Sequence, residues 1–562
     1  MGVAGGRSDA RRAELRAAGR RMSRLSRLGL ALALSLGLAV AASARTARAV
    51  PDAAIADVRA MVAAAPDPWG LAVAVTDRDG TLLVATHGYA DIAARAPVTA
   101  DTRFAIGSIS KSFTAITLMQ LADEGRFDPD APIARYLPDF HPRTAFPAIT
   151  GDALLTHTSG LPNYLFDVAS MRFAIVAAND VELRTAPGAH FWYSNLGYQL
   201  LGYAAERIEG QPFALVLKRR VLDRLGMAAT APQIDDRLRG RIATSYARSP
   251  DGSYHQAPWF PYLAADGAIV STAGDMASYA RMLLARGDAP GGRLISARAF
   301  ARLATARLDD YGYGLEVRDQ GRVLAHSGSI AGFQAYLNVD LGQGVAVVLL
   351  GNGPIDPSLR DRIIARLAGK APAASPVPKP FAEPSSFAGH FAGPHGERLV
   401  IAVDASGQLT AAQDGATLPL VRLTRDGWGA YLTPQGPRSF LFFRDAAGAV
   451  TGVSDGATDY ARAGSGPPPA ETPAAYRPLV GRYMAHGEEG PGLRIFVRNG
   501  RLMMAYADSN APPDALAEDG SGRFRLAEPA YAPEQLVFDT IIDGRAQRLK
   551  LSGVPLYRID LP

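Results

Sequence analysis

Residues 104–125 read FAIGSISKSFTAITLMQLADEG, a short extended segment followed, after Gly107, by a helix. The helix is expected because apolar residues recur with the spacing of a single helix face, at Ala115, Leu118, Met119 and Ala122. Ser108 would then lie at or near the N-terminus of this helix. Lys111 follows three residues later on the same face, so its amine can reach the Ser108 hydroxyl.

This serine–lysine pair has a chemical use. A serine hydroxyl becomes an effective nucleophile when a neighbouring base takes its proton, and a lysine can be that base where its environment favours the neutral amine. Backbone N–H groups at a helix N-terminus also stabilise developing negative charge. The alternative is a serine that only caps the helix and a lysine on the surface. However, Lys111 is one of only five lysines in the chain, and it extends the apolar stripe.

A second candidate lies in residues 188–210, GAHFWYSNLGYQLLGYAAERIEG, where another helix begins. Tyr193 and Asn195 flank its start, where side chains commonly face a cleft. A tyrosine can shuttle the proton of a serine–lysine pair, and an asparagine can hold a substrate amide. Taken in isolation, Asn195 is better interpreted as a helix cap.

The third candidate is HSGS, residues 326–329, on an expected strand. Gly328 would let a substrate backbone approach closely, and the amide of Ser329 could join that of Ser108 as the second donor to an oxyanion. His326 would be a polar group lining the pocket. Taken in isolation, a surface β-turn is the simpler interpretation of this stretch.

In this order the motifs SISK, YSN and HSG resemble those of the serine beta-lactamase and penicillin-binding-protein superfamily. The resemblance is greatest to the branch that holds class C beta-lactamases, D-alanyl-D-alanine carboxypeptidases, D-aminopeptidases and related esterases. The stretches LLTHTSGLPNY (154–164), YGYGLEV (311–317) and HSGSIAGF (326–333) are also similar to the family. The resemblance covers roughly residues 52–369.

The resemblance implies an α/β catalytic domain, in which an antiparallel sheet is flanked by helices and joined by a helical subdomain. Ser108 would attack an amide or ester carbonyl and become acylated. Lys111 would be its base, and Tyr193 would work with it and protonate the leaving group. Water would then release the acyl group, and neither a metal nor another cofactor is needed.

For substrate binding, the resemblance implies that Asn195 positions the substrate and that the Ser108 and Ser329 amides, beside Gly328, form the oxyanion hole. His326 would help to hold an anionic or carbonyl group. Beta-lactamases usually have lysine at this position, where it helps to bind the carboxylate of the drug. Histidine here is similar to the peptidase and esterase branches, so a true beta-lactamase is less expected.

The first 49 residues have the pattern of a cleavable signal peptide. Arginines at 20, 21, 24 and 27 precede an apolar run over residues 28–42, and a small-x-small cleavage site follows at residues 47–49. Met22 is an alternative start to Met1. An uncleaved anchor is the alternative interpretation, but the run is short for the ~20 residues that span a bilayer. The body is therefore expected to be periplasmic or secreted, with no other membrane association.

The body divides into a catalytic region, residues 50–369, and a β-rich tail. Paired strands are expected near both ends of the catalytic region, at 70–75 with 82–86 and at 333–339 with 345–350, with a largely helical segment between them. Residues 370–386, rich in Pro, Ala and Ser, predict a linker.

Two small all-β, barrel-like domains are expected after the linker, at 387–463 and 464–562. An internal repeat supports this division, since FAGHF at 387–391 matches LVGRY at 479–483. Further matches relate Leu409 to Leu502 and Phe442 to Phe538.

Composition narrows the function further. The chain has no cysteine, which excludes disulfides and cysteine nucleophiles. Ten arginines and two acids lie in residues 1–49, so 49 basic residues face 52 acidic ones in the rest, and no nucleic-acid footprint remains.

The sequence therefore favours an exported serine hydrolase of peptide-like substrates, similar to D-aminopeptidases or D-Ala carboxypeptidases. An esterase using the same site, or a non-catalytic protein that binds cell-wall fragments or a partner, is the alternative. The oligomeric state stays open.

Overall fold

The computed structural model describes residues 50–559, apart from residues 164–170, 249–253, 371–382, 414, 423–426, 431–437, 456–457, 466–472, 486–491, 507–512 and 521. The expected signal peptide and most of the expected linker lie outside the described residues. Among the residues that are described, no helix has both the length and the apolar character that crossing a membrane requires.

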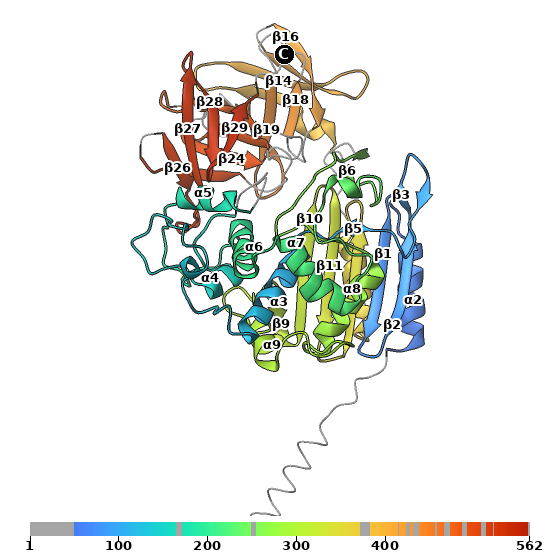
Figure 1. The fold of residues 1–562 in the computed structure, drawn as a ribbon. Coiled ribbons are helices and arrows are strands. Elements are labelled where there is room, and N and C mark those ends of the chain that lie inside the picture. The colour runs from blue at the N-terminus through green and yellow to red at the C-terminus, as the bar shows by residue number, and fades with distance from the viewer. Residues whose placement is uncertain are drawn as a thin grey trace, which may run out of the picture. The chain divides into compact units, whose positions relative to one another are not determined.

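A six-stranded antiparallel sheet forms the centre of the catalytic region, in the order β2-β1-β12-β11-β10-β9 (Figure 1). Two strands come from its start, β1 (Leu71–Asp77) and β2 (Thr81–His87). Four come from its end: β9 (Glu316–Arg318), β10 (Val323–Ile330), β11 (Phe333–Asp340) and β12 (Val345–Gly351). β1 pairs with β12 along its whole length, so the two expected strand groups form one sheet.

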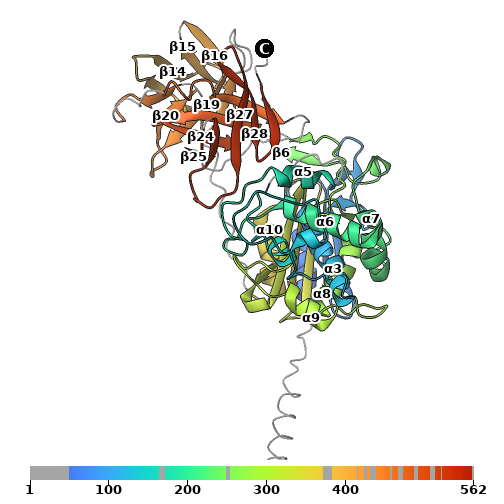
Figure 2. The same ribbon diagram turned by 60° about the vertical axis from the view of Figure 1, so that its left-hand side comes forward.

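Helices cover both faces in the middle of this sheet (Figures 1 and 2). Every residue of β12 is buried, and so are six of the seven residues of β1. α8 (Ala273–Leu284) packs on one face, against β1 and β12. On the other face, α2 (Asp52–Ala63) packs against β2 and against α10 (Pro357–Leu367). This two-sided burial explains why β1 and β12 have near-continuous apolar sequences instead of alternating ones.

The helical part of the catalytic region is built around α3 (Ser110–Asp123), which contacts α6 (Asn195–Glu209), α7 (Phe213–Leu217) and α9 (Ala297–Leu303). α4 (Gly151–Leu155) and α5 (Phe173–Asn179) pack against α6. Every residue of α3 from Ser110 to Leu121 is buried. The apolar stripe predicted for this helix is therefore only one of several buried faces, and Lys111 lies in the core.

Three two-stranded sheets complete the catalytic region. They pair β3 (Tyr89–Asp91) with β4 (Ala96–Pro97), β5 (Phe104–Ala105) with β8 (Val270–Ser271), and β6 (Tyr246–Arg248) with β7 (Tyr254–Gln256). The pair β5–β8 lies directly before the Ser108 turn and ties that turn to the segment before α8.

The β-rich tail consists of two antiparallel units, each with its own apolar core. The first is a nine-stranded sheet of β13 (Gly389–Ala392), β14 (Arg398–Val403), β15 (Leu409–Gln413), β16 (Ala416–Pro419), β17 (Val421–Arg422), β18 (Gly427–Ala430), β19 (Arg438–Arg444), β20 (Val450–Ser454) and β21 (Asp459–Arg462). The second is a closed barrel of β22 (Gly481–Ala485), β23 (Gly492–Arg498), β24 (Arg501–Tyr506), β25 (Asp514–Glu518), β26 (Arg523–Leu526), β27 (Gln535–Ile542), β28 (Arg545–Leu551) and β29 (Val554–Arg558).

The first unit is barrel-like although its sheet is not closed by hydrogen bonds. Its two edge strands, β16 and β17, are separated in the chain by Leu420 alone. The sheet must therefore curl until its edges meet. The repeat falls on matching strands, because Leu409 and Leu502 are buried on β15 and β24, and Phe442 and Phe538 on β19 and β27.

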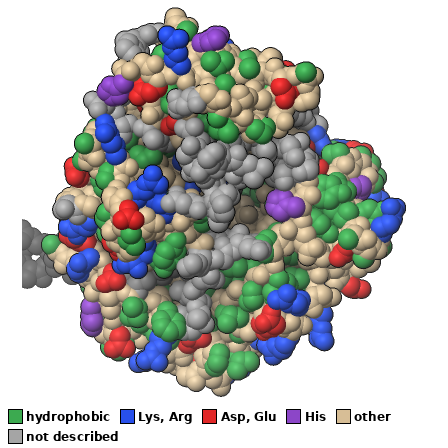
Figure 3. All heavy atoms as spheres, turned by 90° about the horizontal axis from the view of Figure 1, so that it is seen from above, with side chains coloured by type: hydrophobic (Ala, Val, Ile, Leu, Met, Phe, Trp, Pro, Cys, Tyr) green, Lys and Arg blue, Asp and Glu red, His purple; other side chains and the backbone are tan. Residues whose placement is uncertain are grey.

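On the face of the molecule in Figure 3, Lys and Arg side chains are interspersed with Asp and Glu and form no continuous basic field.

Asn352, directly after β12, ties the sheet to the surrounding loops. Its side chain is fully buried. Its Oδ1 accepts a hydrogen bond from the Gly70 N–H at 2.5 Å. Its Nδ2 donates to the carbonyls of Tyr89, Ala90 and Thr244 at 2.7–3.1 Å. One side chain thus satisfies backbone groups from three separate segments.

We predict that Asn352→Ala lowers the free energy of unfolding of the catalytic region by about 3 kcal/mol or more, because each buried group left unpaired costs roughly 1–3 kcal/mol. Asn338→Ala, at a half-buried position of β11, is the matched control and should cost about 1 kcal/mol or less. Urea unfolding measures both. Equal losses in the two variants would contradict the role given to Asn352.

Candidate active site

The predicted serine–lysine pair forms as its spacing indicates. Ser108 lies in a 3-10 turn, Gly107–Ile109, directly before α3, and Lys111 lies in the first turn of α3. The Nζ of Lys111 donates to Ser108 Oγ at 3.0 Å and to the carbonyl of Asp266 at 2.9 Å. No part of Lys111 is exposed to solvent. The amine is therefore fixed at the serine oxygen, where a base must be to take up the serine proton.

The surroundings of Lys111 are aromatic and acidic. Its Nζ lies 4.9 Å from the ring centre of Tyr193 and 5.8 Å from that of Tyr198. Both carboxylate oxygens of the buried Asp266 lie 2.9 Å from the hydroxyl of Tyr262, which donates to them. Burial raises the pKa of Asp266, and the charge of Lys111 opposes this shift. The two groups are thus coupled through a low-dielectric interior.

Two glycines let the backbone beside Ser108 lie directly against β10. Gly107 has a φ of +51°, and a Cβ there would lie 2.6 Å from the Ser329 nitrogen. A Cβ on Gly328 would lie 1.9 Å from the carbonyl oxygen of Ile106. The Ser108 and Ser329 backbones are therefore neighbours, as an oxyanion hole built from their two amides requires. The oxyanion role itself stays a prediction.

Tyr193 and Asn195 lie on either side of the helix start, as predicted, but the cap is the residue between them. Ser194 Oγ accepts the Gly197 N–H and closes the first turn of α6. Asn195 is the first residue of the helix. Its isolated interpretation as the cap is therefore wrong, because a serine directly before it satisfies the free N–H group.

His157 holds the Tyr193–Asn195 segment in place through a hydrogen bond and a ring contact. It is fully buried, it has a positive φ of 57°, and its Nδ1 accepts the Ser194 N–H at 3.0 Å. Its ring centre lies 4.2 Å from that of Tyr193. Burial, together with the charge of Lys111, holds the pKa of His157 well below its usual value. His157 therefore acts as a neutral, fixed acceptor that supports Tyr193.

Asn195 presents a free acceptor. Its backbone N–H donates to the Asn163 carbonyl at 3.2 Å. Its side-chain Oδ1 is buried and has no hydrogen-bond partner within the described part of the chain. A buried carbonyl without a partner costs free energy unless a ligand supplies a donor. The role of Asn195 in positioning a substrate stays a prediction.

His326 lies on β10 and has partners for both ring nitrogens. Its Nδ1 lies 2.6 Å from the Ser327 carbonyl, which can only accept, so Nδ1 carries the proton. Its Nε2 then accepts from the hydroxyl of Tyr311 at 2.8 Å. Burial, and then the charge of Lys111, lower the pKa of His326 to about 4. His326 is thus neutral at pH 7, and its predicted role in holding a substrate group remains a prediction.

Of the predicted site residues, Ser108, Tyr193, His326 and Ser329 line a cleft of about 780 Å³, whereas Lys111, Asn195 and Gly328 are not among its lining residues. Sequence reasoning missed part of its wall: Asp309, Asp310, Tyr311, Glu316 and Arg318. The stretch 311–317 had been matched to the family without roles for its side chains. Arg318 forms an ion pair with Glu316, so three carboxylates face a single guanidinium in this cleft.

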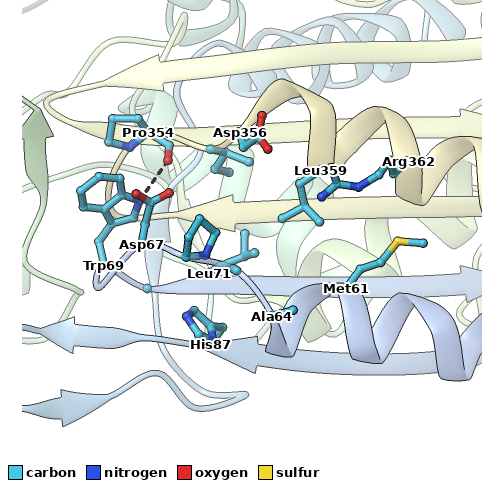
Figure 4. A pocket seen from close by; sticks show the side chains of 14 residues that line it. Met61, Ala64, Asp67, Trp69, Leu71, His87, Pro354, Asp356, Leu359 and Arg362 are labelled. Carbon is cyan, nitrogen blue, oxygen red and sulfur yellow. Dashed lines mark hydrogen bonds between the residues drawn. The ribbon is translucent and has the colours of Figure 1, made fainter. Parts of the chain in front are cut away.

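A second cavity, of about 200 Å³, lies between α2, the start of β1 and α10 (Figure 4). Its walls are mostly apolar, including Met61, Leu71 and Leu359. At its rim, Trp69 Nε1 donates to the Pro354 carbonyl at 2.9 Å. It shares no lining residue with the Ser108 cleft and holds none of the predicted catalytic residues. The larger cleft, which contains Ser108, is therefore the candidate active site.

The fold and the serine–lysine geometry define a serine hydrolase. The family model described as Beta-lactamase matches residues 58–370, more than half of the chain, and the chain belongs to this family. Penicillin-binding protein 4 of Amycolatopsis lactamdurans is 30% identical over 332 residues, which cover 55% of this chain and 87% of that protein. Esterase EstB of Burkholderia gladioli is 35% identical over 178 residues, 28% of this chain and 45% of that protein. The octameric penicillin-binding protein homologue from Pyrococcus abyssi is similar in fold, with a TM-score of 0.51 and 24% identity over 73% of this chain and 98% of that one.

We predict that Ser108→Ala abolishes turnover and that Lys111→Ala lowers kcat by roughly three orders of magnitude or more, because nucleophile and base act as a unit. Lys218→Ala, at an exposed lysine on the helical side, is the control and should keep full activity. Steady-state kinetics measures all three. Full activity in Ser108→Ala would show that another group attacks the substrate.

The low pKa of His326 also predicts a pH effect on stability. The unfolded histidine takes up its proton near pH 6.5, whereas the folded one does so near pH 4. The stability that depends on the neutral ring is therefore present above pH 6.5 and is lost as the pH falls toward 4. Between pH 7 and 4 the wild type should lose about 3 kcal/mol more than His326→Gln. Denaturant unfolding at both pH values measures the difference, and parallel losses would refute the assignment.

Proposed function

We propose that this serine hydrolase cleaves amide bonds of small peptide-like substrates that have a free amino group. The observation that carries the proposal is the acidic lining of the Ser108 cleft, where Asp309, Asp310 and Glu316 accompany a single guanidinium, Arg318, that is already paired with Glu316. A peptide-like substrate with a free amino group carries a positive charge that these carboxylates attract, whereas a simple ester carries none. Peptide-like substrates with a free amine therefore gain an electrostatic attraction in this cleft.

In the proposed reaction, Ser108 Oγ transfers its proton to the amine of Lys111, which acts as the base, and attacks the substrate carbonyl. The developing oxyanion lies between the amides of Ser108 and Ser329. Tyr193, whose ring contacts the Lys111 amine, passes the proton on to the leaving nitrogen, and the C–N bond breaks. Water then attacks the acyl-enzyme, and the proton returns to Ser108 as the acid leaves.

The charges of the cleft favour an amino group over a carboxylate in the substrate. Asp309, Asp310 and Glu316 line the cleft, and its guanidinium, Arg318, is already paired with Glu316. His326 is neutral at pH 7 and offers no positive charge to a carboxylate. Of the two peptidase types left open by the sequence, this favours an aminopeptidase or amidase over a D-Ala carboxypeptidase, and it disfavours a true beta-lactamase.

An esterase is the second candidate, and the similarity to Esterase EstB supports it. The same serine–lysine pair would hydrolyse an ester without any change in geometry. A non-catalytic binding protein has less support, because the 3.0 Å contact between Lys111 and Ser108 is the one that chemistry requires. We further propose that the protein acts outside the cytoplasm, on the basis of the signal-peptide pattern in residues 1–49.

The test uses residues 50–562 in two steps. First, a fluorophosphonate probe followed by peptide mapping should give a single adduct on Ser108. Second, alanine p-nitroanilide should be hydrolysed at least tenfold faster, by kcat/KM, than its N-acetyl derivative, because the derivative loses the positive charge. D- and L-enantiomers are compared in parallel, and the panel also holds acyl-D-Ala-D-Ala, p-nitrophenyl acetate and nitrocefin.

Asp310→Asn provides the matched variant, since it removes one carboxylate of the cleft and leaves the volume unchanged. This variant should lower the ratio of kcat/KM for alanine p-nitroanilide to kcat/KM for its N-acetyl derivative. A labelled Ser108 combined with hydrolysis of p-nitrophenyl acetate alone would instead establish the esterase. Faster hydrolysis of acyl-D-Ala-D-Ala than of the free-amine amides would contradict the charge argument.

A further inference from the structure

The closed β barrel contributes one buried carboxylate to the surroundings of the active site. Glu534 lies in the loop between β26 and β27, and only 6% of it is exposed. One of its oxygens, Oε1, accepts two hydrogen bonds from the catalytic region. The donors are Trp192 Nε1–H at 2.8 Å and the backbone N–H of Asn163 at 3.1 Å.

Both partners of Glu534 are attached directly to the YSN motif, Trp192 through the chain and Asn163 through hydrogen bonds. Trp192 directly precedes Tyr193, and its backbone N–H donates to the His157 carbonyl at 2.7 Å. Asn163 accepts the Asn195 N–H on its backbone carbonyl at 3.2 Å and on its Oδ1 at 3.3 Å. A single oxygen of the barrel therefore fixes the chain on both sides of the Tyr193 to Asn195 segment.

The aromatic contacts of the same barrel loop strengthen this attachment. The ring of Tyr531 stacks in parallel on His190, with ring centres 4.0 Å apart. The same ring meets Trp192 edge-on at 6.1 Å. Trp192 itself packs against the apolar core of the barrel. The residues that precede Tyr193 are thus held by the barrel through stacking as well as through hydrogen bonds.

A purely structural role does not explain Glu534, because its burial lowers the stability of the fold. Its second oxygen, Oε2, is buried and has no hydrogen-bond partner within the described residues. Burial raises the pKa of Glu534, and the nearby Asp514 adds to the shift. A buried carboxyl group with half of its acceptors unused destabilises a fold compared with an apolar side chain. Its placement is explained by the two donors that it orients.

We propose that Glu534 is a positioning residue of the hydrolase, through which the closed barrel holds Tyr193 and Asn195 in their working geometry. The barrel is then part of the catalytic apparatus and not an independent appendage. Tyr193 contacts the Lys111 amine, so a displaced Trp192 would move the proton-transfer group. A displaced Asn163 would release the backbone of Asn195, which positions the substrate. This inference rests on the hydrolase activity proposed above.

The experiment uses the full body, residues 50–562, with p-nitrophenyl acetate, an activated ester that does not depend on the substrate class. Glu534→Ala should lower kcat at least tenfold, because both donors lose their acceptor. Glu534→Gln should stay within about threefold of the wild type, because its amide oxygen can accept both hydrogen bonds. Glu518→Ala, an exposed acid on the same barrel, is the control and should leave kcat unchanged.

Trp192→Phe tests the hydrogen bond between Trp192 and Glu534 by removing its donor. It keeps the aromatic packing and removes the donor, so its loss in kcat and that of Glu534→Ala should be less than additive in the double variant. Thermal melting of every variant reports folding. If Glu534→Ala does not fold, Glu534→Gln and Trp192→Phe still test the proposal, since both keep the bulk of the contact.

The outcomes separate the two proposals. Wild-type protein that gives neither a Ser108 adduct nor turnover would refute the hydrolase function itself. An active wild type with Glu534→Ala equal to Glu518→Ala in kcat would overturn the positioning role. Equal loss in Glu534→Gln and Glu534→Ala would also overturn it, because rescue by an uncharged acceptor is what the hydrogen bonds require. Loss in the alanine variant with rescue by glutamine would support it.

Discussion

The burial of Lys111 is the constraint on which the rest of the structure depends. An amine without solvent contact must find its partners inside the protein, and here they are Ser108 Oγ and the Asp266 carbonyl. To reach both, the lysine has to leave the core helix α3 at its first turn and point toward the segment before α8. The surrounding tyrosines and the buried Asp266 carboxyl then provide the polar environment that an isolated amine in an apolar core would lack.

The remaining parts of the site are held against this centre by backbone contacts and not by long side chains. Gly107 and Gly328 allow the serine turn and β10 to touch, with no room for a Cβ on either. His157 and His326 are neutral because both are buried and because the charge of Lys111 opposes a second positive charge nearby. The Lys111 amine therefore lies beside the nucleophile Ser108, whereas acidic side chains line the wall of the cleft.

Local patterns predicted the parts of this site that lie within one element. The three-residue spacing of Ser108 and Lys111 fixes their contact on one helix turn, and the strand pairs at both ends of the region followed from apolar runs and turn signals. Contacts between elements could not be predicted in this way. Nothing in the sequence near His326 shows that Tyr311 will occupy its Nε2, because Tyr311 precedes β9 and meets His326 on β10 only in the fold. Ser194 and Asn195 are both good capping residues, and local sequence does not decide between them. Glu534 lies more than 300 residues from Trp192 and has no local signal at all.

The pairing of β1 with β12 also constrains the order of events during synthesis. Leu71 lies opposite Gly351, and Asp77 lies opposite Val345, so the central ladder of the sheet joins residues that are 268 to 280 positions apart in the chain. A ribosome has to deliver β12 before this edge of β1 can be covered, whereas β2, which follows directly in the chain, can pair with the other edge at once. The central sheet therefore closes only after the helical segment between its two strand groups has been made.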